Sequence, residues 1–168
     1  QKSLVVDGSG DFVVNNIGTG VTVDADGDSG DVDVPLSGTL VVETSGGATG
    51  VEILTGSATT TVDTQTGTTG GDVTVEALAL TDDTFLNISG DAAATVNDLI
   101  GELDASAMSD GARRVNTADS DAAGGDGETT LTVGDTDATV VTAGSGDEIT
   151  VEAALMGAGA SGGLTLSG

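Results

Sequence analysis

Short runs of apolar and β-branched residues recur along the chain, separated by polar turns. The runs begin at positions 4, 12, 21, 32, 40, 51, 60 and 73, so their starts lie 8 to 13 residues apart. Gly, Asp, Ser, Asn and Thr dominate between them, and these residues favour turns because they adopt positive φ or bond to their own backbone. The pattern therefore predicts many short β-strands joined by tight connections.

Strands of this length and spacing suit two all-β folds. One is a repetitive parallel β-solenoid, similar to a β-helix or β-roll, and the other is a tandem array of β-sandwich repeats. The solenoid is favoured because the chain has no long apolar alternations and only 1% aromatic residues, so its core must use small aliphatic side chains. Helices are expected at most over 92–103 and 151–160, and the Thr and Val content of the first argues against it.

Short motifs also recur about 80 residues apart and in the same order. The matching pairs are SGD at 9–11 and 89–91, DA at 24–25 and 104–105, GDVTVEA at 71–77 with GDEITVEA at 146–153, and LNISG at 86–90 with LTLSG at 164–168. A conserved order of matches indicates a tandem repeat. We predict repeat unit 1 over 1–80, repeat unit 2 over 81–160 and the start of a third unit over 161–168, as in a segment of a longer array.

Composition restricts the function. Lys and Arg number 3 against 28 Asp and Glu, a formal net charge of −25, and such a surface repels nucleic acid and anionic lipid while attracting cations. No apolar run approaches the ~18 residues of a membrane span. The chain has no His or Cys. Carboxylate-based glycosidases usually bind sugar with aromatic and basic side chains, and this chain has only two Phe and three basic residues, Lys2, Arg113 and Arg114. We therefore expect no nucleic-acid partner, no membrane span and no enzymatic activity.

The densest acidic cluster lies in the stretch DADGDSGDVDV at 24–34. Its carboxylates can converge on one hard cation, and Ca²⁺ is the natural candidate because it accepts oxygen ligands of irregular number. The cluster is not an EF-hand, since Gly30 comes one position late and Pro35 replaces the required Glu. A solvated acidic turn is the alternative. The predicted metal ligands here are Asp24, Asp26, Asp28 and Asp31.

Two further turns combine glycines with an aspartate. They are AGSGDEITV, with Gly144, Gly146 and Asp147, and DGSGDFVV, with Gly8, Gly10 and Asp11. Both resemble the nonapeptide G-G-x-G-x-D-x-U-x of bacterial RTX proteins, with the carboxylate one place early. The resemblance implies that Asp11, Gly144, Gly146 and Asp147 take part in calcium binding, and a purely structural turn is the alternative for each.

In composition and short motifs, residues 86–111 and 130–151 resemble the Thr/Ala/Gly-rich repeats of bacterial surface-layer proteins and of large adhesins exported by type I systems. That resemblance implies an extracellular or cell-surface structural protein, a calcium-stabilised segment of a surface layer, adhesin or matrix filament. Its expected partners are other copies of itself. The alternative is an adhesin binding module that recognises a cell-surface glycan or ice.

Overall fold

The computed structural model describes residues 2–27, 34–66, 71–81, 83–108, 113–117, 128–133, 139–142, 148–153 and 163–167. Within these ranges the secondary structure consists of β-strands and contains no helix. The strands are β1 (Lys2–Val5), β2 (Phe12–Ile17), β3 (Val21–Asp24), β4 (Leu40–Thr44), β5 (Val51–Leu54), β6 (Thr60–Asp63), β7 (Asp72–Glu76), β8 (Phe85–Ser89), β9 (Ala93–Leu99), β10 (Glu102–Ala105), β11 (Arg113–Thr117), β12 (Glu128–Val133), β13 (Thr139–Thr142), β14 (Glu148–Glu152) and β15 (Leu164–Ser167).

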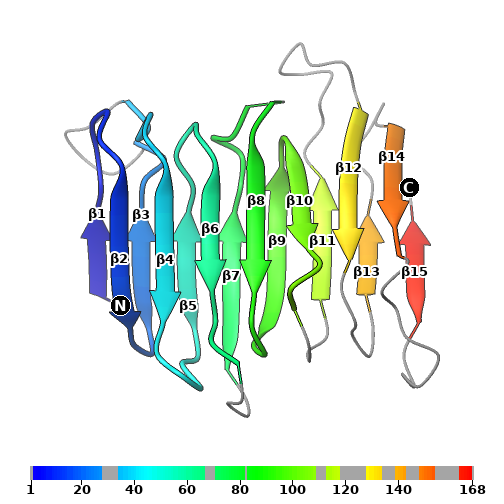
Figure 1. The fold of residues 1–168 in the computed structure, drawn as a ribbon, viewed down its shortest axis with the longest axis horizontal. Coiled ribbons are helices and arrows are strands. Elements are labelled where there is room, and N and C mark those ends of the chain that lie inside the picture. The colour runs from blue at the N-terminus through cyan, green and yellow to red at the C-terminus, as the bar shows by residue number, and fades with distance from the viewer. Residues whose placement is uncertain are drawn as a thin grey trace.

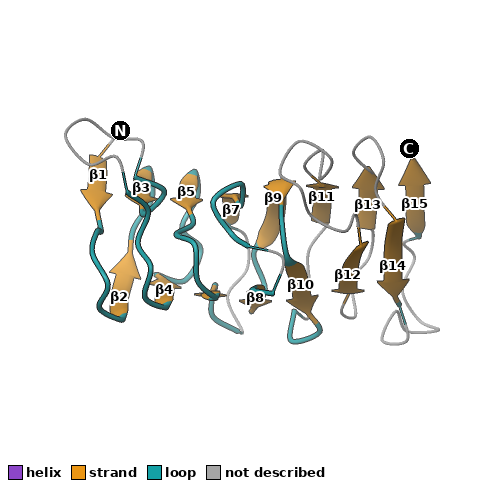
Figure 2. Ribbon diagram, turned by 90° about the horizontal axis from the view of Figure 1, so that it is seen from above, coloured by secondary structure: helices purple, strands orange, loops and turns teal. Residues whose placement is uncertain are grey.

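Odd and even strands form two separate sheets. The eight-stranded sheet runs β1-β3-β5-β7-β9-β11-β13-β15, and the seven-stranded sheet runs β2-β4-β6-β8-β10-β12-β14. Successive strands alternate between the two sheets, and the strands of one sheet point in the opposite direction to those of the other (Figure 1). The coils stack along the long axis of the molecule, so β1 and β15 lie at its opposite ends. Seen from above, the two sheets form two layers (Figure 2).

Neighbouring strands within each sheet are parallel throughout the described ranges. This arrangement confirms the predicted parallel β-solenoid. The alternative of tandem β-sandwich repeats is wrong, because such sandwiches are built from antiparallel strands.

Coil length varies along the solenoid. Side chains in contact on successive coils of the eight-stranded sheet are 30 residues apart for Thr22 and Glu52, 21 for Glu76 and Asn97, and 19 for Asn97 and Asn116. The strands stay in register because the connections between them absorb these differences.

The predicted repeat units can be placed on the strands, although the unit boundaries stay a prediction. Residues 1–80 contain β1 to β7, and residues 81–160 contain β8 to β14. Among the described residues, each predicted unit therefore holds seven strands, an odd number. As a result, β7, from the first matched motif, and β14, from the second, lie in opposite sheets.

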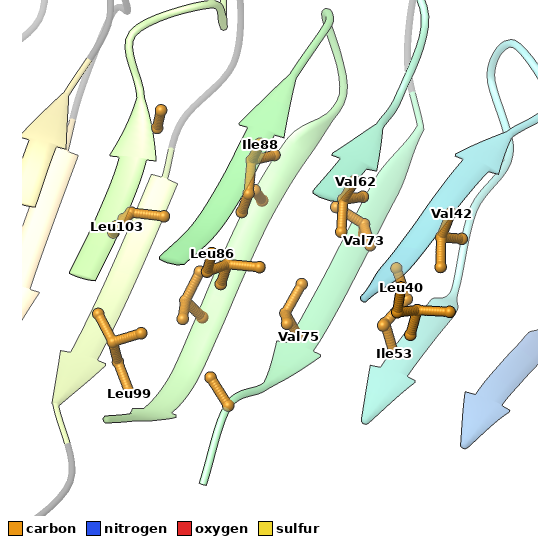
Figure 3. Packing of buried hydrophobic residues seen from close by; sticks show 14 of the residues in the cluster. Leu40, Val42, Ile53, Val62, Val73, Val75, Leu86, Ile88, Leu99 and Leu103 are labelled. Carbon is orange, nitrogen blue, oxygen red and sulfur yellow. The ribbon is translucent and has the colours of Figure 1, made fainter. Parts of the chain in front are cut away.

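Small aliphatic side chains fill the space between the sheets, as the low aromatic content of the chain predicted. Alternate residues of each strand face the other sheet, as in β4 and β9, and neighbouring strands align them in rows. The central inner row of the eight-stranded sheet buries Val23, Ile53, Val75, Val96, Val115 and Val141, and the opposite sheet buries Leu40, Thr60, Leu86, Leu103 and Leu131. Figure 3 shows several of these side chains between the strands of the two sheets.

Ser-Gly pairs form corners at which one coil rests on the previous one. The backbone N–H groups of Ser37 and Ser57 donate to the carbonyl oxygens of Gly8 and Leu36, at 3.0 and 2.8 Å. A Cβ on Gly56 would collide with the carbonyl oxygen of Leu36. The glycine is therefore required for close approach of the two coils.

The helix expected over 92–103 does not form, because this stretch supplies β9 and the start of β10. Val96 and Leu99 are three residues apart, a helical spacing, yet both are buried in a strand. A positive φ of 51° at Asp98 accompanies a shift in register, and this bulge turns Leu99 inward. Of the second expected helix, 151–152 belong to β14, and 154–160 lie outside the described residues.

Candidate functional site

The described ranges contain only part of the predicted metal-binding set. Asp24 is the last residue of β3, Asp26 lies in the bend that follows, and Asp11 immediately precedes β2. Outside the described residues lie Asp28, Asp31, Gly144, Gly146 and Asp147. The structure therefore gives the surroundings of Asp24, Asp26 and Asp11 only.

Asp24 is almost completely buried at the end of β3. Its neighbours in the sheet are Val5 on β1 and Leu54 on β5, both apolar. The side chain is 7% exposed, and its Oδ1 atom has no hydrogen-bond partner. Leaving a buried polar atom unpaired costs about 1–3 kcal/mol, and more when the group is charged.

Two other aspartates near strand ends behave differently. Asp63, at the end of β6, accepts a hydrogen bond at Oδ1 from the Gln65 N–H at 2.9 Å. Asp104, near the end of β10, accepts one at Oδ1 from the Ser106 N–H, also at 2.9 Å. Each carboxylate thus closes a turn onto the backbone two residues further on. The Oδ1 atom of Asp24 makes no such bond.

Asp11 joins the first coil to the second. Its Oδ1 atom accepts hydrogen bonds from the Thr39 N–H at 2.9 Å and from the Thr39 hydroxyl at 2.8 Å. These bonds, with the backbone donor contributing most, hold the pKa of Asp11 below its ordinary value of 3.8. One oxygen of this predicted calcium ligand is therefore already engaged in holding coils together. Whether Asp11 also binds calcium stays a prediction.

The outer face of the eight-stranded sheet carries a polar row. Thr22, Glu52, Thr74 and Thr95 occupy successive register positions on β3, β5, β7 and β9. The Thr22 hydroxyl donates to Glu52 Oε2 at 3.0 Å. A shallow hollow of about 260 Å³ lies over this row and is lined by Gly50, Val51, Glu52 and Thr74. Its walls can offer hydroxyl and carboxylate groups to a polar ligand.

Sequence reasoning missed a second ladder on the same face. The amide nitrogen of Asn97 donates to Glu76 Oε1 at 2.7 Å, and that of Asn116 donates to Asn97 Oδ1 at 3.1 Å. Three successive coils are linked in this way. The two separations, 21 and 19 residues, follow the local coil length. Because coil length varies along the solenoid, no single spacing in the sequence identifies this ladder.

Among the residues that the structure describes, no group of three or more acidic side chains is placed to hold a metal ion, and no helix could cross a membrane. Within the same ranges, the buried acidic oxygen that lacks a hydrogen-bond partner is Oδ1 of Asp24. No protein-family model, curated protein or solved structure matches this chain.

Proposed function

We propose that this chain is an extracellular structural protein, a calcium-stabilised repeat segment of a surface layer, adhesin or matrix filament that self-assembles. The observation that supports this most is the stacking of parallel coils, in which each interior strand pairs with the coil on either side and buries its inner side chains against them. The same inner rows reach the outermost strands of the described residues. Leu4 on β1 and Phe12 on β2 are 40% and 39% exposed, and Leu166 on β15 is 61% exposed. They are in register with side chains that interior coils bury.

The outermost strands also carry backbone groups that can extend the sheets. The outer edges of β1 and β15 pair with no other strand among the described residues. An unpaired edge is a template for another strand, and the exposed aliphatic side chains beside it supply the matching core. A further coil, whether from a longer array of the same chain or from a second copy, would continue both sheets, and we propose other copies as the partner of this chain.

Charge supports the calcium part of the proposal. A net charge of −25 on stacked coils produces repulsion between neighbouring carboxylates, and bound cations reduce it. An extracellular location agrees with the absence of Cys, the acidic composition and the resemblance to surface-layer and adhesin repeats.

Self-assembly can be tested by sedimentation velocity and electron microscopy over a range of protein concentrations with calcium present. The unmodified chain should form rods that lengthen with concentration. Leu4→Lys and Leu166→Lys should shorten them, because each places a charge in the proposed contact. Leu78→Lys is the matched control, since Leu78 is 61% exposed but lies in the turn after β7. A monodisperse monomer at high concentration would overturn the proposal.

A glycan-binding adhesin module is the second candidate, and the polar hollow beside Glu52 and Thr74 favours it. Ice binding is less favoured, because Glu52 interrupts the row of threonines and engages the Thr22 hydroxyl. A glycan array and an ice-recrystallisation assay separate these activities from a pure scaffold, which should give no signal in either.

A further inference from the structure

We propose that the Asp24 carboxylate, at the end of β3, is the anchoring ligand of a calcium ion and that binding there produces the calcium response of the solenoid. The inference rests on the proposed function, a calcium-stabilised scaffold, and assigns the effect of calcium on the stability of the solenoid to one residue.

The first argument is the unsatisfied oxygen. In the part of the chain that the structure describes, the buried side-chain oxygens without a hydrogen-bond partner are Asp24 Oδ1 and Thr55 Oγ1. A threonine hydroxyl is neutral, and its burial is tolerated at moderate cost. A carboxylate carries a charge, and a buried charge requires a counter-charge or a ligand.

The second argument is that no basic side chain can supply this counter-charge. The chain has three basic residues, Lys2, Arg113 and Arg114. The two arginines lie on β11, four strands from β3 in the same sheet, roughly 19 Å at about 4.8 Å per strand. Lys2 pairs with Val21, three residues before Asp24, and an odd separation places it on the other face of the sheet. An ion from solution is the remaining source of positive charge.

The third argument compares Asp24 with Asp104. Each precedes a fully buried alanine, Ala25 or Ala105, and the two Asp-Ala pairs are matched by the sequence repeat. Asp104 is half-buried and its Oδ1 atom accepts the Ser106 N–H, whereas Asp24 is buried and its Oδ1 atom accepts nothing. The same Asp-Ala sequence thus gives one carboxylate, Asp104, with a hydrogen bond at Oδ1 and another, Asp24, without one. Asp104 is therefore an internal control.

Calcium fits this position better than magnesium does. It binds carboxylate and carbonyl oxygens with six to eight ligands in irregular geometry, whereas magnesium demands a near-ideal octahedron and retains its water. A strand end with one fixed carboxylate suits the more tolerant ion.

The experiment follows thermal unfolding by far-UV circular dichroism, since the chain has no Trp or Tyr to report by fluorescence. The unmodified chain, Asp24→Asn and Asp104→Asn are compared in chelator, in calcium and in magnesium. For the unmodified chain, calcium at about 100 times its Kd should raise the Tm by about 5–10 °C. Asp104→Asn should keep this shift and Asp24→Asn should lose it. In chelator, Asp24→Asn should melt no lower than the unmodified chain, because Oδ1 of Asp24 has no hydrogen-bond partner to lose.

The outcomes separate this inference from the proposed function. A calcium shift that survives in Asp24→Asn overturns the assignment to Asp24 and leaves the calcium-stabilised scaffold standing. The absence of any calcium shift in the unmodified chain overturns both. An equal shift with magnesium indicates general charge screening and also overturns the site. If Asp24→Asn does not fold, Asp24→Leu, which matches Val5 and Leu54 on the neighbouring strands, gives the same comparison.

Discussion

Asp11 on the first coil accepts two hydrogen bonds from Thr39 on the second, one from its backbone N–H and one from its hydroxyl. The two residues are 28 positions apart in sequence, and the carboxylate holds the corner of one coil against the next. Because the acceptor is a carboxylate whose pKa is lowered by the contact, the strength of the corner depends on pH.

Asp11→Ala should lower the Tm at neutral pH, and the effect should disappear in acid. The pKa of Asp11 is below 3.8 in the folded chain and returns to that value on unfolding, so its contribution is complete above pH 3.8 and is lost as pH falls through the folded pKa. Melting curves between pH 7 and pH 2 should show the two proteins converging. Asp7→Ala, at an exposed position in the same turn, controls for the loss of one negative charge. A constant difference in Tm across this range would contradict the prediction.

Two buried threonines should respond in opposite directions to the same substitution. The Thr55 hydroxyl has no partner, so Thr55→Val should raise the free energy of unfolding by about 1 kcal/mol. The Thr64 hydroxyl donates to the Ser89 carbonyl at 2.8 Å and accepts the Ala92 N–H at 3.2 Å. Thr64→Val should therefore lower the free energy of unfolding by about 1–3 kcal/mol. Urea denaturation measures both, and equal signs would contradict the assigned hydrogen bonds.

Gly56→Ala should destabilise the solenoid by about 1–3 kcal/mol, because the added methyl group meets the Leu36 carbonyl and separates two coils. Gly18→Ala is the matched control. A Cβ at Gly18 has no atom within 4 Å, so the free energy of unfolding of Gly18→Ala should differ little from that of the unmodified chain. Urea denaturation of the two variants, prepared together, checks the difference. A similar loss for both would show that the close approach at Gly56 is unimportant.

The fold could be predicted from the sequence because strand spacing and side-chain size both depend on the local pattern. Short runs with small aliphatic residues indicate narrow stacked coils, and residues such as Val23, Val75 and Val96 are buried accordingly. The helix expected over 92–103 failed because the spacing of Val96 and Leu99 is shared by a helix and by a strand with a bulge at Asp98. Only pairing with the neighbouring coil decides between them.

The candidate site was harder to predict, since Asp24 and Asp104 look alike in sequence. Both follow a buried aliphatic residue, both precede alanine, and both have other acidic residues nearby in the sequence. Their difference comes from the neighbours that coil stacking provides and from the backbone path after each strand. Neither is a property of the local sequence, so the acidic cluster alone could not identify the unsatisfied oxygen.

The odd number of strands in each predicted unit has a geometric consequence. Thr74 and Glu76 lie on the outer face of one sheet, and their counterparts Thr150 and Glu152 are exposed on the opposite sheet. The second predicted unit is thus turned over relative to the first. A longer array of such units would be a two-sided ribbon, with the same chemistry displayed alternately on both broad faces. A lateral contact made by one face would then be repeated by the other, and such ribbons would be able to join side by side into a continuous layer.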